Sequence, residues 1–281
     1  MLKIWITGST GQIGTAINEI LNPLGYEVFD TDHEVLDVTN LEEVLNFCKS
    51  NRPQVIINCA GIASDKECRD NPERAYHVNA LGARNIAIGA AKISAKLVQI
   101  STDDVFDGKS DSPITEFDRT NPQTVYGKSK ECGENFVKEF TYKHFIIRSS
   151  WVYGNGQNFV TYILNKAKRG EELNISRDQC SSPTSVKELA RFILYIINTN
   201  EYGTYHFTNT GRCSRIDFAK EILKISGLTD VKINEVHKSD SEYSMNHPTY
   251  AVLDNFIIRI ENKYKALPWK EALAEFIQET K

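Results

Sequence analysis

A glycine-rich turn near the start of the chain constrains its fold more than any other feature. The turn, Thr7–Gly14, reads TGSTGQIG. It joins an apolar run, Leu2–Thr7, to an amphipathic segment, Gln12–Leu21, so a strand is predicted to pass directly into a helix. This arrangement is typical of the first βα unit of a dinucleotide-binding sheet. We therefore expect an α/β chain whose first strand belongs to a parallel sheet.

The rest of the first half continues this alternation of strands and helices. Further strands are predicted at Tyr26–Asp30, Gln54–Asn58, Lys96–Ser101 and His144–Arg148, and helices at Leu41–Ser50, Pro72–Lys92 and Tyr126–Phe140. Thr39 and Glu42 have capping-box spacing at the first of these helices. Strands that are almost wholly apolar are buried on both faces, and right-handed crossovers wind such a sheet doubly. The predicted fold class is α/β, with a Rossmann-type doubly wound parallel sheet.

In the second half of the sequence, predicted strands and helices alternate less regularly. Helices are predicted at Phe159–Lys168, Val186–Thr199, Arg215–Ser226 and Trp269–Thr280, and a short strand at Thr204–Thr208. We expect a dinucleotide-binding domain over residues 1–150. Residues 151–281 are expected to form mainly a small C-terminal substrate-binding lobe, with some segments returning to the sheet.

Composition and charge limit the classes of partner. The 281 residues are 41% hydrophobic and 25% charged, with a net charge of −4, as in a soluble globular protein. A mildly acidic chain without basic runs is poorly suited to nucleic acid, and no apolar stretch approaches the roughly 18 residues that cross a membrane. We read no targeting segment and expect a cytoplasmic protein. The six cysteines include no C-x-x-C pair and are expected to be reduced, and no metal site is predicted.

The glycine-rich turn has the chemistry of a pyrophosphate site. Gly8 is predicted to make the tight turn, Gly11 to let the cofactor approach the backbone, and Gly14 to let the helix pack closely on the sheet. The helix N-terminus favours the negative charge of the pyrophosphate. The neighbouring residues of the same turn are assigned to the cofactor as well: Thr10, Gln12 and Ile13. A merely flexible turn is the alternative.

The end of the second predicted strand carries an acid. Asp30 is placed to accept hydrogen bonds from the adenosine ribose and to repel the 2′-phosphate of NADPH, and no arginine follows it closely. The cofactor is therefore expected to be NADH or NADPH, with NADH favoured. Asp37 and Val38 are assigned to the adenine. The alternatives are that Asp30 is a turn residue and that Asp37 is a solvated residue ahead of the helix.

A tyrosine and a lysine one helical turn apart form the predicted catalytic centre. Tyr126 and Lys130 are four residues apart, which places both on one face of a helix. The ammonium is expected to lower the pKa of the phenol, which is otherwise near ~10, toward the operating pH. The hydroxyl of Thr102, at the end of a neighbouring strand, would bind the same carbonyl oxygen that receives the proton. Tyr162 and Lys166 have the same spacing, but no strand ending in Ser or Thr shortly precedes them.

These motifs resemble those of the extended short-chain dehydrogenase/reductases and, among them, the dTDP-4-dehydrorhamnose reductase family. The resemblance covers nearly the whole chain. It rests on TGSTGQIG, LDVTN (Leu36–Asn40), VNALGARNIA (Val78–Ala87), STDDVFDG (Ser101–Gly108), VYGKSK (Val125–Lys130), SSWVYGNGQNFV (Ser149–Val160) and DQCSSPT (Asp178–Thr184). It implies reduction of the 4-keto group of a nucleotide-linked 6-deoxyhexose, in particular dTDP-4-dehydro-L-rhamnose to dTDP-L-rhamnose.

The resemblance also implies further site residues. Trp151 is expected to lie against the deoxysugar, with a core aromatic as the alternative, and Asp103 and Asp104 are expected near the substrate. Asn79, which is assigned to the cofactor-binding residues, resembles the superfamily's structural asparagine in the long helix, and a polar residue on the helix face is the alternative. Residues assigned to the cofactor from the loop after the third predicted strand are Ala60, Gly61 and Ala63.

The chain departs from the family pattern at several positions. The family usually has tyrosine where this chain has Asp104, and the loop after the third strand differs from the usual AAYTxVD, so the sugar is left open. The family's magnesium at a dimer contact uses acidic residues. Thr15 occupies one such place, so the metal is not carried over, and a homodimer stays an open alternative.

Two other functions compete with a reductase. Nucleotide-sugar 4,6-dehydratases follow the threonine with Asp-Glu, which Thr102-Asp103-Asp104 approaches. A dehydratase would consume no net NADH, whereas a reductase would oxidise it stoichiometrically. The second alternative is a non-catalytic NAD(P)-binding regulatory subunit, which would not need to keep Thr102, Tyr126 and Lys130 together.

Overall fold

The fold consists of two compact units. The structure, a computed structural model, describes residues 1–241 and 248–280. Unit 1 comprises Met1–Phe106, Arg119–Arg148 and Ala190–Tyr205, and unit 2 comprises Asp107–Asp118, Ser149–Leu189 and His206–Lys281. The predicted boundary at residue 150 lies next to the division at 148/149. The expectation did not include the transfer of residues 107–118 to the second unit.

Unit 1 is built on a six-stranded sheet. Its strands are β1 (Lys3–Thr7), β2 (Glu27–Thr31), β3 (Val55–Asn58), β4 (Lys96–Thr102), β5 (His144–Ser149) and β10 (Gly203–His206), in the order β10-β5-β4-β3-β1-β2. The pairs β1–β2, β1–β3 and β3–β4 are parallel. The predicted α/β class with a Rossmann-type sheet is confirmed.

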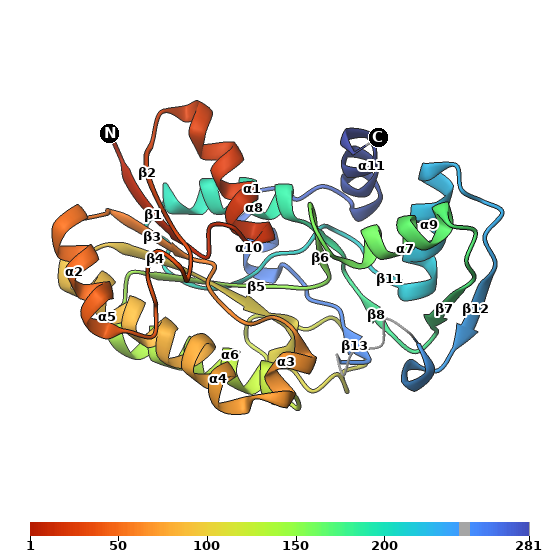
Figure 1. The fold of residues 1–281 in the computed structure, drawn as a ribbon, viewed down its shortest axis with the longest axis horizontal. Coiled ribbons are helices and arrows are strands. Elements are labelled where there is room, and N and C mark those ends of the chain that lie inside the picture. The colour runs from red at the N-terminus through yellow and green to blue at the C-terminus, as the bar shows by residue number, and fades with distance from the viewer. Residues whose placement is uncertain (242–247, 281) are drawn as a thin grey trace. The chain divides into compact units, whose positions relative to one another are not determined.

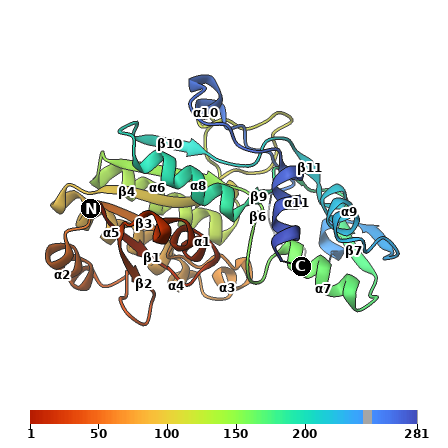
Figure 2. The same cartoon turned by 90° about the horizontal axis from the view of Figure 1, so that it is seen from above.

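Helices cover both faces of this sheet. They are α1 (Gln12–Leu21), α2 (Leu41–Asn51), α3 (Asp65–Asp70), α4 (Pro72–Tyr76), α5 (Ala83–Ile93), α6 (Val125–Phe140) and α8 (Val186–Ile197), which begins in unit 2. Figures 1 and 2 show α1 and α8 on one face and α2, α5 and α6 on the other. The Lys96 ammonium donates to the carbonyls of Ile197 and Thr199, at distances of 2.9 and 2.6 Å, and so satisfies the C-terminal end of α8.

The strand register brings the ends of β1, β2, β3 and β4 to one edge of the sheet. Thr7 pairs with both Thr31 and Asn58, and Asn58 pairs with Gln99. The Asn58 amide also links the strands, since it accepts from the Thr7 hydroxyl at 2.6 Å and donates to the Gln99 side chain at 2.7 Å. Ligands of such sheets bind at the carboxyl ends of the strands, so the glycine-rich turn and Thr102 lie at the edge where a ligand is expected.

Two of the predicted helices differ in detail. Asn40, not Thr39, caps α2, because its side chain accepts from the amides of Glu42 and Glu43. The single helix predicted over Pro72–Lys92 is interrupted by a π-helical segment, His77–Gly82, between α4 and α5. Such π segments are frequent at functional sites, and this one contains Asn79.

Unit 2 contains small sheets and helices around an aromatic core. Its strands are β6 (Val152–Tyr153), β7 (Leu173–Ser176), β8 (Cys180–Ser181), β9 (Thr184–Ser185), β11 (Cys213–Ser214), β12 (Ile233–Val236) and β13 (Tyr250–Ala251), and its helices are α7 (Phe159–Lys168), α9 (Arg215–Ser226), α10 (Phe256–Glu261) and α11 (Trp269–Glu279). The ring of Phe218 packs against the rings of Phe159 and Trp269, at centroid distances of 5.7 and 5.8 Å.

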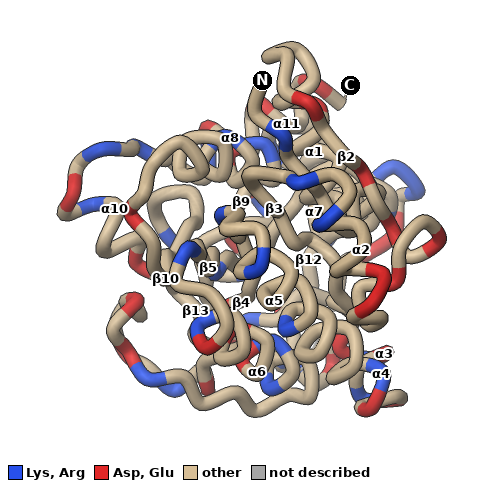
Figure 3. Tube along the Cα trace, turned by 90° about the vertical axis from the view of Figure 1, so that its left-hand side faces the viewer, with Lys and Arg blue, Asp and Glu red and all other residues tan. Residues whose placement is uncertain are grey.

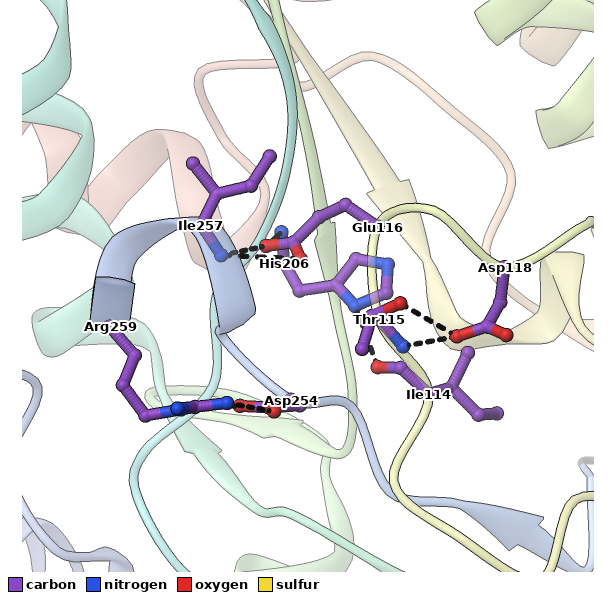
Figure 4. A network of polar contacts seen from close by, with 8 residues as sticks. All are labelled: Ile114, Thr115, Glu116, Asp118, His206, Asp254, Ile257 and Arg259. Atoms are coloured by element: carbon purple, nitrogen blue, oxygen red, sulfur yellow. Dashed lines mark hydrogen bonds and ion pairs between the residues drawn. The ribbon is translucent and has the colours of Figure 1, made fainter. Parts of the chain in front are cut away.

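A carboxylate fixes residues 107–118 within unit 2. The Glu116 side chain accepts from the backbone amides of His206, at 3.0 Å, and Ile257, at 3.4 Å (Figure 4). The second of these amides lies in the first turn of α10, where the side chain of the N-cap residue, Asn255, makes no capping hydrogen bond. Burial raises the pKa of Glu116, and the negative charge of Asp254 raises it further. Glu116 therefore takes the place of an N-cap for α10.

Charged residues of both signs are interspersed along the trace (Figure 3). No helix in the part of the chain that the structure describes is long and apolar enough to cross a membrane. Within residues 1–241 and 248–280, no group of three or more His, Cys, Asp or Glu side chains is placed to hold a metal ion.

Candidate active site

The glycine-rich turn forms a narrow backbone cradle between β1 and α1. Gly8 has φ +63°, and a Cβ added there would lie 2.7 Å from the Ala60 nitrogen. A Cβ on Gly14 would lie 2.5 Å from the Gly8 carbonyl oxygen, so Gly14 is required by the turn itself rather than by the packing of helix on sheet. Gly11, whose amide donates to the Gly8 carbonyl at 3.1 Å, begins α1 without a side-chain cap. The N-terminal turn of α1, which begins without a side-chain cap, therefore fits a dinucleotide pyrophosphate.

The other residues of the turn surround this cradle. Thr10 is exposed, and Gln12 and Ile13 are half-buried. The Thr15 hydroxyl donates to the Ser9 carbonyl at 3.3 Å, which ties the start of the helix to the turn. The predicted cofactor residues of this segment thus lie together around the N-terminus of α1.

Asp30 lies exposed near the end of β2, one strand away from the turn. Its carboxylate accepts from the Asn18 side chain at 2.8 Å, so α1 fixes its orientation. The sequence analysis did not single out Asn18. The parallel register places Asp30 opposite Ile6, close to the glycine-rich turn, as expected for a residue that binds the adenosine ribose.

Asp37 and Val38 have clear structural contacts. The Asp37 carboxylate accepts from the Thr39 amide at 2.8 Å, which makes it part of the turn ahead of α2. Val38 is buried, and its carbonyl accepts from the Asn85 side chain at 3.1 Å. These contacts correspond to the structural alternative for Asp37, and the assignment of both residues to the adenine stays a prediction.

Asn79 joins the loop after β3 to the catalytic helix. It accepts from the Ile62 amide at 2.8 Å and donates to the Ile62 carbonyl at 3.0 Å. It also donates to the Ser129 hydroxyl at 2.9 Å, and Ser129 donates in turn to the Tyr126 carbonyl at 2.8 Å. Asn79 is thus bonded to both the loop and α6. Ser129, three residues after Tyr126, was not singled out from the sequence.

The loop that Asn79 holds runs beside the predicted catalytic lysine. A Cβ on Gly61 would lie 3.0 Å from the Asn79 amide oxygen and 3.7 Å from the Lys130 ammonium. Ala60 is half-buried, whereas Gly61 and Ala63 are exposed. Of the three predicted cofactor residues of this loop, Ala60 therefore lies beside Gly8 and Gly61 beside Lys130.

The structure brings Thr102, Tyr126 and Lys130 together at the end of β4. Thr102 is the last residue of β4, and its hydroxyl forms a hydrogen bond with the phenol of Tyr126. Lys130, which is buried, donates from its ammonium to the Ile100 carbonyl at 2.7 Å. The Thr124 hydroxyl accepts from the Gly127 amide at 2.8 Å and so fixes the first turn of α6.

Two glycines of α6 allow this approach, and the sequence analysis missed both. A Cβ on Gly127 would lie 2.1 Å from the Asp104 carbonyl oxygen. A Cβ on Gly133 would lie 2.4 Å from the Asn79 carbonyl oxygen. Because these contacts are with backbone atoms of other segments, only glycine lets α6 lie this close to the end of β4 and to the π-helical segment. The sequence alone shows neither partner.

The pKa of Tyr126 shifts in the direction opposite to the expectation. Burial raises it, and the charge of Asp104 raises it further, while the hydrogen bond with Thr102 lowers it. The prediction that the pKa of Tyr126 is lowered toward the operating pH is therefore wrong, because its net shift is upward. The phenol is protonated at neutral pH, the form that can donate a proton.

The ammonium of Lys130 is the more labile acid of the pair. Burial lowers the pKa of Lys130 to about 8, and the nearby carboxylate of Glu134 opposes that shift. A lysine with a pKa close to physiological pH, in a site with a polar partner, is typical of a functional position.

Asp103 and Asp104 begin a short 3-10 turn, Asp103–Val105, directly after Thr102. The Thr102 hydroxyl donates to the Asp103 carboxylate at 3.1 Å and accepts from the Asp104 amide at 3.2 Å. Both acids are buried, 5% and 2% exposed. The structure thus brings two carboxylates to Thr102, the predicted catalytic threonine, and places Asp104 close enough to raise the pKa of Tyr126.

Trp151 lies in unit 2. Its φ of +42° is in the left-handed region that bulky residues rarely adopt. The Arg215 guanidinium lies 3.4 Å from the centroid of its ring, and the ring of Phe218 stacks at 6.3 Å. These contacts fit the alternative of a core aromatic, and the deoxysugar contact stays a prediction.

The second Tyr–Lys pair also lies in unit 2, where the Lys166 ammonium is 5.6 Å from the ring of Tyr162.

The chain matches a known family over its whole length. The family model described as the RmlD substrate binding domain matches residues 2–281. The spore coat polysaccharide biosynthesis protein SpsK of Bacillus subtilis is 36% identical over 99% of this chain and 98% of its own length.

Solved structures agree with this match. A dTDP-4-dehydrorhamnose reductase from Clostridium acetobutylicum is 42% identical, with a TM-score of 0.96 and 99% of both chains covered. A dTDP-4-dehydrorhamnose reductase from Bacillus anthracis, solved in complex with NADP, is 38% identical, with a TM-score of 0.95 and 100% of both chains covered. At these identities the likeness extends beyond the fold.

Proposed function

Because the chain belongs to the dTDP-4-dehydrorhamnose reductase family, we propose that it reduces the 4-keto group of a nucleotide-linked 6-deoxyhexose with NADH or NADPH. We assign it the specific reaction from dTDP-4-dehydro-L-rhamnose to dTDP-L-rhamnose. The enzyme is thus an NAD(P)H-dependent nucleotide-sugar ketoreductase. The identity of the sugar, L-rhamnose, is the more specific part of the proposal.

One observation carries this assignment. Thr102, Tyr126 and Lys130 meet at the carboxyl end of β4, in the same unit and at the same sheet edge as the glycine-rich turn. A decoy pair with the same spacing, Tyr162 and Lys166, has an aromatic contact but no such surroundings. A proton donor beside a dinucleotide cradle is the arrangement that carbonyl reduction needs.

The residues of the site have separate roles. When bound, the reduced nicotinamide supplies hydride to the carbonyl carbon. Tyr126 gives its proton to the carbonyl oxygen, and its raised pKa keeps that proton in place at neutral pH until the oxygen gains negative charge. Thr102 orients the carbonyl through its hydroxyl, and Lys130 donates to the nicotinamide ribose.

The remaining predicted residues complete the proposal. Asp103 and Asp104 contribute to the substrate site through the turn after Thr102, and Trp151 contacts the deoxysugar. NADH is the favoured cofactor because the Asp30 carboxylate, held by Asn18, would repel a 2′-phosphate. The Bacillus anthracis relative binds NADP, so this preference needs a direct comparison of the two cofactors.

The decisive experiment offers the purified protein a panel of 4-keto nucleotide sugars with each cofactor. Nicotinamide absorbance reports turnover, and NMR identifies the product. We expect stoichiometric oxidation of the cofactor and a product whose new C4 hydroxyl has the configuration found in L-rhamnose. A 4-hydroxy nucleotide sugar is offered as well; its loss of water without net cofactor consumption would instead establish a dehydratase, with Asp103 and Asp104 as the neighbouring acids. Cofactor binding without turnover of any sugar would indicate the regulatory subunit.

A further inference from the structure

A buried carboxylate follows the catalytic lysine by one turn of α6. Lys130 donates to the Ile100 carbonyl at 2.7 Å, and Glu134 accepts from the hydroxyl of the next strand residue, Ser101, at 2.6 Å. Residues four apart lie on one face of a helix, so both side chains face the end of β4. Two consecutive residues of the strand therefore hold two consecutive turns of the helix.

An arginine from the neighbouring strand fixes this carboxylate. Arg148 of β5 donates to both oxygens of Glu134, at 2.9 and 2.7 Å, in a bidentate pair. The two side chains are only 4% and 1% exposed. Lys138 lies 3.5 Å from the same carboxylate. These contacts hold the pKa of Glu134 below its usual range although burial alone would raise it, so the group is ionised at neutral pH.

Of the acidic groups that act on the pKa of Lys130, one is negatively charged at neutral pH. Those that act on its pKa are Glu134 on α6, Cys59 at the end of β3 and Cys68 on α3. Burial raises the pKa of the Cys59 thiol to about 12 and that of the Cys68 thiol to about 11, so both are neutral at physiological pH. Among the described groups that act on Lys130, Glu134 alone then offers a negative charge to a buried ammonium.

We propose that Glu134 is a positioning residue for catalysis: its carboxylate, fixed by Arg148 and Ser101, keeps Lys130 charged and aligned so that Lys130 can donate to the cofactor. This inference rests on the role given to Lys130 in the proposed function. A buried ion pair that served stability alone would need no particular distance from the catalytic lysine. Here Glu134 lies one helical turn from Lys130, and the two side chains bond to adjacent residues of the same strand, β4.

The test removes the negative charge of Glu134 and keeps the shape of its side chain. In Glu134→Gln, the amide oxygen can still accept from Ser101 and Arg148, while the negative charge is lost. The pKa of Lys130 is read directly by NMR of protein labelled at lysine side-chain carbons, with Lys130→Arg to assign the resonance. We expect the Lys130 resonance in Glu134→Gln to titrate about one pH unit lower than in the wild type, the size typical of losing a nearby opposite charge.

A second readout follows cofactor affinity against pH. The alkaline loss of affinity for NADH should move to lower pH by the same amount as the lysine resonance. Glu139→Gln, on the exposed side of the same helix, is the matched control and should leave both curves unchanged. Glu134→Asp, which keeps the charge, should restore most of the wild-type titration.

Several outcomes would overturn the proposal. An unshifted lysine titration in folded Glu134→Gln, even with a lower Tm, would reduce Glu134 to a structural role. Should that variant fail to fold, Glu134→Gln/Arg148→Gln removes the buried pair together, and its Lys130 resonance must titrate at lower pH than that of Arg148→Gln, in which only the cation is lost. The NMR titration needs neither substrate nor turnover, so it can be interpreted even if the proposed reaction is not found. Likewise, an unshifted Lys130 titration would not contradict the proposed reaction.

Discussion

Replacement of Gly127 by alanine tests whether the close approach of α6 to the end of β4 sets the catalytic geometry. The added Cβ would lie 2.1 Å from the Asp104 carbonyl oxygen, whereas ordinary contacts begin at 3.4 Å. The first turn of α6 must therefore move by about 1.3 Å, the difference of these two distances. Tyr126, the preceding residue, moves with it.

The expected effects follow from this displacement. A misplacement of about 1 Å can cost roughly a hundredfold in rate, so we expect kcat to fall about a hundredfold. Overpacking costs about 1–3 kcal/mol, and alanine recovers about 1 kcal/mol of helix propensity, which leaves a net loss of about 0–2 kcal/mol. For a chain of this size that corresponds to a decrease in Tm of at most about 8 °C.

The assay compares kcat, the KM for NADH and the Tm of the variant with those of the wild type. The KM for NADH should change little, because the glycine-rich turn is untouched. Gly89→Ala is the control, since it lies within α5 and its Cβ would meet the Cys48 sulfur at 2.9 Å, away from the site. A folded Gly127→Ala enzyme with wild-type kcat would refute the argument that backbone contact at this glycine positions Tyr126.

Three further predictions concern single side chains. Tyr126→Phe should abolish turnover and leave NADH affinity, measured by fluorescence titration, nearly unchanged; retained turnover would remove Tyr126 as the proton donor. Asp30→Ala should raise kcat/KM for NADPH relative to NADH several-fold, since the charge that repels the 2′-phosphate is gone, whereas Asp32→Ala should leave the ratio alone; equal ratios for the two variants would contradict the ribose assignment. Burial raises the pKa of Glu116 in the folded state, so its protonated form favours folding, and this contribution is lost as pH rises from the unfolded pKa through the folded one. Glu116→Gln keeps an acceptor for the amides of His206 and Ile257, so its Tm should equal or exceed that of the wild type at pH 7, with the difference shrinking in acid; a large drop in Tm at pH 7 would show that the charge itself is needed.

Local patterns in the sequence were enough to find the core of the site. The glycines of the first turn, Tyr126 and Lys130 at helical spacing, and Thr102 at the end of an apolar run each depend on residues only a few positions apart. Backbone periodicity and turn chemistry act over that range, which is why β1, α1 and α6 lie within a residue or two of the predicted bounds.

Other features depend on partners that are distant in the sequence. Gly127 is needed because of the Asp104 carbonyl, Gly133 because of the Asn79 carbonyl, and Glu134 is held by Arg148. None of these partners can be identified from a periodic pattern, since the chain must first bring β4, β5, α6 and the π-helical segment together. The same reason explains the interruption of the helix predicted over Pro72–Lys92.

The sequence by itself determined the class of fold and was enough to propose the cofactor cradle and the proton donor, because those depend on short-range chemistry. Only the tertiary structure decided the ionisation of the proposed donor. Burial and the charge of Asp104 raise the pKa of Tyr126, and burial lowers that of Lys130. Desolvation is a property of the assembled interior, where every packed segment excludes water, so spacing along the chain could not predict the direction of either shift.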